Sequence, residues 1–115
     1  DAPSPGTGTV VFLSAQYEEI SAGFTAHGRI RYPAERVADD AFEAFDAYRR
    51  TRAALDPHLA DQVVLPLALA SGISHLTTSH VTAHLQTVAW LVGLFTGREI
   101  SVRGQIGAPG EVLIL

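Results

Sequence analysis

The fold class is decided by the stretch from Asp56 to Gly72, which reads DPHLADQVVLPLALASG. Aspartate followed by proline is typical of a helix start, because the carboxylate accepts hydrogen bonds from first-turn amides and proline has no amide hydrogen to leave unpaired. The residues from His58 to Ala70 are apolar nearly all round, which predicts a helix buried in a core. Glycine at position 72 is a suitable end for that helix.

Strands and further helices are predicted on both sides of this helix. Alternating β-branched and apolar residues indicate strands, and apolar residues three and four apart indicate helices. The predicted elements, in order, are strands at 9–15 and 21–31, a helix from Pro33, the helix at 58–70, a strand at 75–78, a helix with Ser79 as its N-cap that ends at Gly97, and strands at 99–103 and 111–115. The first two strands are expected to pair. The order ββααβαββ predicts an α+β sandwich with its helices on one sheet face.

The overall composition limits the possible functions. The chain has 115 residues, no cysteine and a formal net charge of −4. We expect one domain over residues 1–115, cytoplasmic and without disulfides. No apolar run reaches the roughly 18 to 20 residues that cross a bilayer, so we expect no membrane partner. The first residue is not methionine and the last residues are apolar, so we expect a piece of a longer protein.

The charged residues limit how this chain could bind nucleic acid and which side chain could be a nucleophile. A net negative chain is not expected to grip nucleic acid with its whole surface, because phosphate binding needs clustered cations. All eight basic residues other than histidine are arginine. Lysine is the usual nucleophile where an enzyme captures a nucleotide as a covalent phosphoramidate. Within this chain only a histidine could take that role.

Three polar residues share one face of the apolar helix. His58, Asp61 and Gln62 are three and four residues apart, so their side chains project together. Polar residues in a first turn commonly cap the helix or bind nearby backbone, and spacing alone favours that interpretation. A binding role requires further evidence.

His84 is expected near the start of the next helix, in its second turn, with His80 one turn before it and Thr87 about one turn after. Amide dipoles at a helix start favour a nearby phosphate and disfavour a protonated imidazole, so a histidine there stays neutral and nucleophilic. Spacing alone favours an ordinary histidine at the edge of the core. His80 and His84 also form an H-x-x-x-H pair that could hold zinc with His75, but no cysteine and no glutamate within the pair supports it, and we predict no metal ligand.

The segment HLADQ at 58–62, which runs into VVLPLALA at 63–70, resembles the nucleotide-contacting signature of the RNA 3′-terminal phosphate cyclases. His84, within TAHLQT at 82–87, lies where the resemblance puts that family's adenylylated histidine. Segments 4–8, 23–28 and 34–38 are also similar to the family, so the resemblance covers almost the whole chain.

The resemblance implies a fold of repeated βαβαββ units, akin to a translation initiation factor domain and to the enolpyruvyl transferases, with this chain as the last unit. It implies that His84 attacks the α-phosphate of ATP in the presence of magnesium, and that the AMP then activates an RNA 3′-phosphate for closure to a 2′,3′-cyclic phosphate. The implied nucleotide contacts are His58, Leu59, Ala60, Asp61 and Gln62. The implied partners are RNA 3′-phosphate ends, ATP and the remaining N-terminal repeat units, without which this chain alone should be inactive.

Two other functions stay open at this point. Val88 stands where the family usually has asparagine, which favours a non-catalytic cyclase-like protein in RNA processing or ribosome assembly. A histidine metal-binding module is the third hypothesis, and metal analysis would distinguish it.

Overall fold

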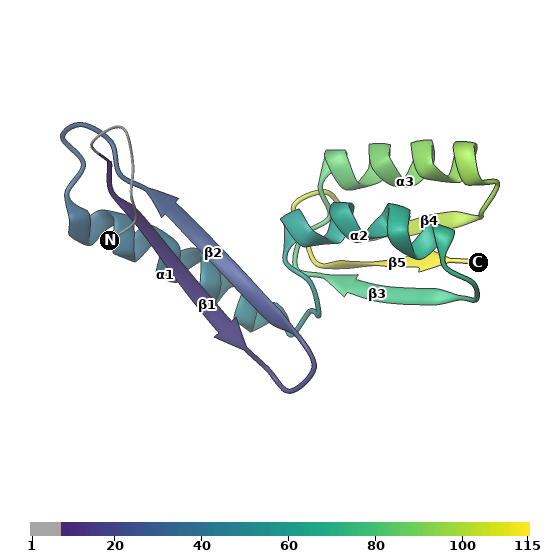
Figure 1. Ribbon diagram of the computed structural model, residues 1–115, viewed down its shortest axis with the longest axis horizontal. Coiled ribbons are helices and arrows are strands. Elements are labelled where there is room, and N and C mark those ends of the chain that lie inside the picture. The colour runs from purple at the N-terminus through teal and green to yellow at the C-terminus, as the bar shows by residue number, and fades with distance from the viewer. Residues whose placement is uncertain (1–7) are drawn as a thin grey trace. The chain divides into compact units, whose positions relative to one another are not determined.

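The chain divides into two compact units, residues 1–50 and 51–115, in a computed structural model that describes residues 8–115 (Figure 1). The contacts concentrate within each of the two units, and a single domain over residues 1–115 stays a prediction. Each unit is therefore described by itself. The element order ββααβαββ agrees with the sequence prediction. The class is α+β, with two small antiparallel sheets and three helices among the described residues.

Unit 1, residues 1–50, is a β-hairpin with one helix packed on it. Strands β1 (Val10–Gln16) and β2 (Ser21–His27) pair antiparallel from Val10 opposite His27 to Gln16 opposite Ser21. Helix α1 (Ala34–Thr51) buries Val37, Ala41 and Tyr48. The rings of Phe24 and Tyr48 lie 5.4 Å apart, centroid to centroid, in a cluster with Ala22. Apolar side chains on one face of the hairpin thus meet the apolar stripe of the helix.

The second predicted strand, 21–31, is too long at its end. It stops at His27, and the Gly28 amide donates to the Thr9 carbonyl at 2.6 Å. Arg31 then takes a left-handed backbone conformation, with φ of 63°, which no strand residue adopts. The family-like segment 4–8 lies, apart from Gly8, outside the described residues.

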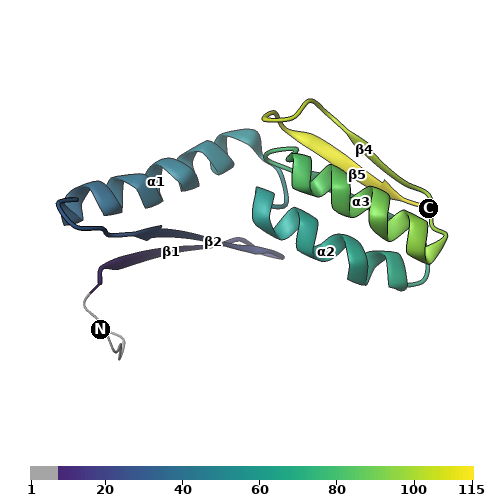
Figure 2. The same cartoon turned by 90° about the horizontal axis from the view of Figure 1, so that it is seen from above.

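Unit 2, residues 51–115, is a three-stranded sheet with two helices side by side on one face (Figures 1 and 2). Strand β5 (Gly110–Ile114) lies between β3 (Ser74–Thr78) and β4 (Ile100–Arg103), antiparallel to both. The covering helices are α2 (Pro57–Leu69) and α3 (Ala83–Thr96). The core is made of fully buried side chains from helices and sheet, among them Val64, Leu85, Val112 and Ile114.

A single residue extends this sheet beyond β3. Leu55 forms a parallel bridge with Thr78: the Leu55 amide donates to the Thr77 carbonyl at 3.0 Å, and the Ser79 amide donates to the Leu55 carbonyl at 2.9 Å. From this bridge onward the elements follow in the order αβαββ. A full strand does not precede α2 in the described part of unit 2.

The start of α3 corrects a prediction. We expected Ser79 to be the N-cap, but the cap is Thr82, whose hydroxyl accepts from the Leu85 amide at 2.9 Å. Ser79 is instead buried, and its hydroxyl is unpartnered among the described residues. Residues 80–82 are held extended because Val81 donates to the Ala108 carbonyl at 2.8 Å. The helix therefore begins three residues later than predicted, and His84 lies in its first turn rather than its second.

The opposite end of unit 2 is fastened by Arg98. Its guanidinium donates to the carbonyls of Leu115 at 2.5 Å and Ala70 at 2.9 Å, and also to that of Gly72. Carbonyls at the end of a helix lack intrahelical partners, so an arginine there satisfies α2 and ties it to the end of β5. No helix in the described residues combines the length and the apolar character that a bilayer crossing needs.

Candidate functional site

Both helices of unit 2 begin at the same end of the sheet. Helix α2 starts two residues after Leu55, which forms a bridge to Thr78, the last residue of β3. Four residues separate the end of that strand from the start of α3. The carboxylate of Asp56 caps α2 by accepting from the amides of His58 at 2.9 Å and Leu59 at 3.0 Å. Two helix N-termini, each the positive end of a dipole, thus lie near one another, and such ends favour anions.

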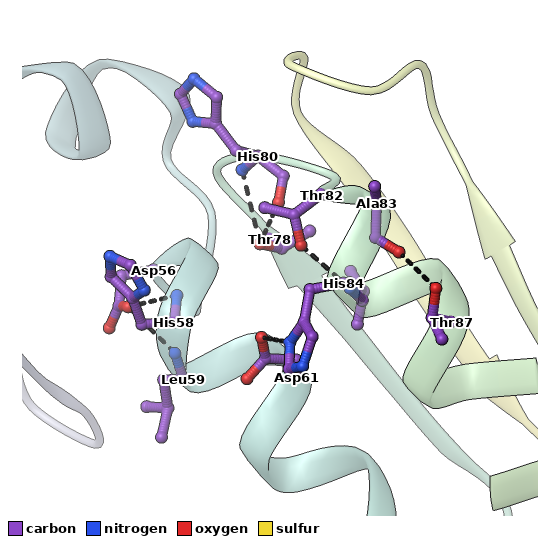
Figure 3. Close-up of polar contacts among 11 residues, drawn as sticks. Asp56, His58, Leu59, Asp61, Thr78, His80, Thr82, Ala83, His84 and Thr87 are labelled. Carbon is purple, nitrogen blue, oxygen red and sulfur yellow. Dashed lines mark hydrogen bonds and ion pairs between the residues drawn. The ribbon is translucent and has the colours of Figure 1, made fainter. Parts of the chain in front are cut away.

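One side-chain pair joins the two helix starts. Nδ1 of His84, in the first turn of α3, lies 2.5 Å from Oδ2 of Asp61 in α2 (Figure 3). The side chain of His84 is 71% exposed, whereas that of Asp61 is 14% exposed. An ionised carboxylate only accepts hydrogen bonds, so Nδ1 carries the proton. In a neutral imidazole the lone pair is then on Nε2, the nitrogen that Asp61 does not bind.

The other residues of the HLADQ segment separate into two groups. The side chains of His58 and Gln62 are exposed, and with Asp61 they form one face of α2, as the spacing predicted. Ala60 is fully buried and Leu59 is half-buried. Ala60 therefore packs in the core, and its side chain is not available to a ligand.

The two other histidines considered for a zinc site, His80 and His75, have hydrogen-bond partners elsewhere in unit 2. His80 is in the loop before α3, where its carbonyl accepts from the Thr78 hydroxyl at 3.1 Å, so the H-x-x-x-H spacing does not become one helical face. His75, on β3, binds the Glu111 carboxylate at 2.7 Å. Thr87 donates to the Ala83 carbonyl at 2.9 Å, within its own helix. Across residues 8–115 there is no group of three or more His, Cys, Asp or Glu side chains that could hold a metal ion.

A model of the family described as RNA 3′-terminal phosphate cyclase matches residues 3–102. The chain belongs to this family. Among RNA 3′-terminal phosphate cyclases, the protein of Methylococcus capsulatus is 48% identical over 96 residues, which is 84% of this chain and 27% of the relative. The cyclase of Gloeothece citriformis is 39% identical over 92 residues, 80% of this chain and 26% of its own.

A more distant cyclase, from Thermococcus onnurineus, is 36% identical over 111 residues, which is 96% of this chain and 32% of the relative. The chain therefore spans about a quarter to a third of the length of these cyclases. Family membership agrees with the resemblance noted on residues 58–70 and 82–87.

Proposed function

We propose that this chain is the nucleophile-bearing portion of an enzyme that uses ATP to convert an RNA 3′-phosphate into a 2′,3′-cyclic phosphate. One observation supports it above the others: His84 is an exposed histidine at a helix start, and its Nδ1 lies 2.5 Å from the Asp61 carboxylate, so that in the neutral ring the lone pair lies on Nε2. A neutral imidazole held in that tautomer is a good acceptor of a phosphoryl group. Family membership supports the proposed reaction class, and the contact between His84 and Asp61 supports the choice of reacting atom.

The first step in the proposal forms a bond between Nε2 of His84 and the α-phosphorus of ATP. The bond from that phosphorus to the bridging oxygen breaks, and pyrophosphate leaves. The ring now has substituents on both nitrogens and carries a positive charge, which the Asp61 carboxylate at 2.5 Å stabilises. Asp61 is therefore a positioning residue in the proposal, and His84 is the catalytic one.

The next two steps use the labile phosphorus–nitrogen bond. An oxygen of the RNA 3′-phosphate attacks the AMP phosphorus, and the His84 nitrogen leaves with its electron pair restored. The neighbouring 2′-hydroxyl then attacks the 3′-phosphorus, loses its proton to water and releases AMP. The RNA ends as a cyclic diester, and the imidazole is regenerated in its starting form.

The nucleotide contacts in the proposal come from the exposed part of the HLADQ segment. His58 and Gln62 present side chains on the same face of α2 as Asp61, and the first-turn amides favour negative charge. Leu59 and Ala60 contribute to this segment by packing it against the core. We therefore assign the direct side-chain contacts to His58, Asp61 and Gln62.

Magnesium has no ligand cluster in this portion, because no group of three or more suitable side chains is found in residues 8–115. Magnesium is commonly bound through one or two carboxylates together with substrate phosphates. In the proposal the ion arrives with the phosphates of ATP. Its remaining ligands would come from the rest of the enzyme.

The rest of a longer polypeptide is the proposed partner of the outer helix surface of unit 2. Exposed apolar side chains gather on α2 and α3: Leu69 is 71% exposed, Trp90 67%, Leu94 66% and Phe95 82%. A large apolar surface of this kind is typical of an interface. The cyclases it matches are about three times as long as this chain, so we propose that preceding βαβαββ units cover it and that unit 2 is the last of them. The chain alone is then inactive. The cytoplasmic location stays a prediction.

The test is to incubate the full-length protein with magnesium and ATP labelled at the α-phosphate. We expect label on the protein that is labile in acid and stable in alkali, lost in His84→Ala and retained in the matched variant His80→Ala. Asp61→Asn should reduce labelling strongly, since an amide can donate to Nδ1 and move the ring proton to Nε2. Label that persists in His84→Ala would refute the nucleophile. An unlabelled wild-type protein would favour the non-catalytic cyclase-like alternative.

A further inference from the structure

A second feature lies at the same end of unit 2 but on the other side of the sheet from the helices. It is a cleft of about 420 Å³ lined by residues that include Arg52, Thr77, Arg103, Gly104, Gly110 and Glu111. Side chains alternate between the faces of a strand. Leu76 and Val112 are buried beneath the helices, so the side chains of Thr77, Glu111 and Arg103 face outward. This cleft is not part of the His84–Asp61 site.

The cations of unit 2 are concentrated in this cleft. Unit 2 contains three arginines, and Arg98 is used to bind backbone carbonyls at the other end. The remaining two, Arg52 and Arg103, both line the cleft. Among the described residues, no carboxylate forms an ion pair with Arg52. Guanidinium groups match the geometry of phosphate oxygens, so two of them in one concavity favour a phosphate ligand.

The one acid in the cleft is already paired. Oε2 of Glu111 lies 2.7 Å from Nε2 of His75, and Oε1 lies 3.5 Å from a guanidinium nitrogen of Arg103. The hydrogen bond from His75 lowers the pKa of Glu111, which favours the ionised form. Because the Arg103 side chain is 70% exposed, it keeps donors for a ligand while Glu111 restrains it.

The cleft is connected to the start of α3 through shared residues. Thr78 lines the cleft, and its hydroxyl donates to the His80 carbonyl, four residues before His84. Gly104 and Gly110 line the cleft as well and lie under Val81. The segment 78–82 therefore separates the cleft from the histidine.

We propose that this arginine cleft binds phosphodiester groups of the RNA upstream of its 3′ end, an inference that rests on the proposed function. With the terminal phosphate at His84, the preceding backbone passes the end of the sheet and places phosphates between Arg52 and Arg103. Such contacts carry no base specificity and fix the position of the strand. They give a chain with a net charge of −4 a local cationic site that can bind RNA.

The test uses full-length protein and a short single-stranded RNA with a 3′-phosphate, titrated over a range of salt concentrations. The Arg52→Gln/Arg103→Gln variant removes two contacts, so the salt slope of log K should fall by about 1.4 and the Kd should rise roughly fifteenfold near 0.15 M salt. Arg31→Gln, which removes the same kind of charge from unit 1, is the control and should change neither quantity. Glu111→Gln removes the only acid, and RNA binding should become tighter.

Labelling by ATP without RNA distinguishes the two proposals. The double arginine variant should be labelled like the wild type, because its arginines do not bind the nucleotide. If labelling falls while RNA binding is unchanged, the cleft holds nucleotide phosphates and the inference is wrong. It is also wrong if Arg31→Gln weakens RNA binding as much as the double variant, or if Glu111→Gln weakens it. A wild-type protein that binds RNA through the cleft but takes no label would refute the proposed function alone.

Discussion

Replacing Gly110 by alanine should lower the stability of unit 2, because the added Cβ atom would collide with its neighbours. A Cβ atom on Gly110 would lie 2.3 Å from the Arg103 carbonyl oxygen and 2.4 Å from a methyl carbon of Val81. Gly110 is absent from the residues with positive φ, so alanine meets no backbone strain there. The whole effect is therefore steric, and it comes from the Arg103 backbone and the Val81 side chain.

The magnitude follows from how far these atoms must move. Ordinary contacts with a Cβ atom begin near 3.4 Å, so the β4–β5 pair would have to open by about an ångström. Overpacking of this kind costs about 1–3 kcal/mol, and we take about 2 kcal/mol because one obstacle is backbone. For a unit of this size, that free energy lowers the melting temperature by about 8 to 16 °C.

The assay is thermal unfolding of the full chain followed by circular dichroism, with Gly107→Ala as the matched control. Gly107 is in the loop just before β5 and has φ of 88°, and a Cβ atom added to it would meet no other atom within 4 Å, so alanine there suffers backbone strain alone. That strain costs about 1 kcal/mol. If Gly110→Ala lowers the melting temperature no more than Gly107→Ala does, the steric argument fails.

Three further predictions concern stability. Thr82→Ala removes the N-cap of α3 and should lower the free energy of unfolding by about 1 kcal/mol. Ser79→Ala removes a buried hydroxyl without a partner among the described residues and should leave that free energy unchanged or raise it. Chemical denaturation of both variants measures the difference. Arg98→Ala leaves the carbonyls at the end of α2 without their partner and should lower the free energy of unfolding by about 1–3 kcal/mol in the same measurement. An unchanged denaturation midpoint would contradict a stabilising role for these Arg98 hydrogen bonds, here called the Arg98 clamp. Hydrogen bonding by Arg49 lowers the pKa of Asp46, so this stabilisation is present above the ordinary carboxyl pKa and is lost as the pH falls through the lowered value; Asp46→Asn should remove that part of the acid sensitivity of melting.

The sequence predicted those elements whose signals are local. The order of all eight elements is confirmed, and so is the pairing of the first two strands, because hydrophobic periodicity and turn residues reflect nearest neighbours along the chain. The helix predicted at 58–70 differs from α2 by only one residue at each end. The agreement is close because Asp56 and Pro57 clearly mark the helix start. The shared face of His58, Asp61 and Gln62 followed from helical spacing alone.

What the sequence did not predict depends on contacts between distant segments. Ser79 and Thr82 are both suitable caps, and the choice between them is made by a loop some 25 residues later, through the hydrogen bond from Val81 to the Ala108 carbonyl. The division into two units has no local signal in the sequence, because no proline- or glycine-rich linker marks residues 50 and 51. The Arg98 clamp has no local signal, since its partners lie 17 to 30 residues away.

The two glycines beneath Val81 also bear on protein engineering. Val81, two residues before α3, packs so closely on Gly104 and Gly110 that a Cβ atom at either position would collide with it. A designer who transfers only the His84–Asp61 pair to a new scaffold would reproduce both side chains but not the position of the imidazole ring. The segment from Gly104 to Gly110, on which Val81 packs, has to be transferred with them. The reactive geometry is thus a property of three sequence-distant segments and should be transplanted as one block.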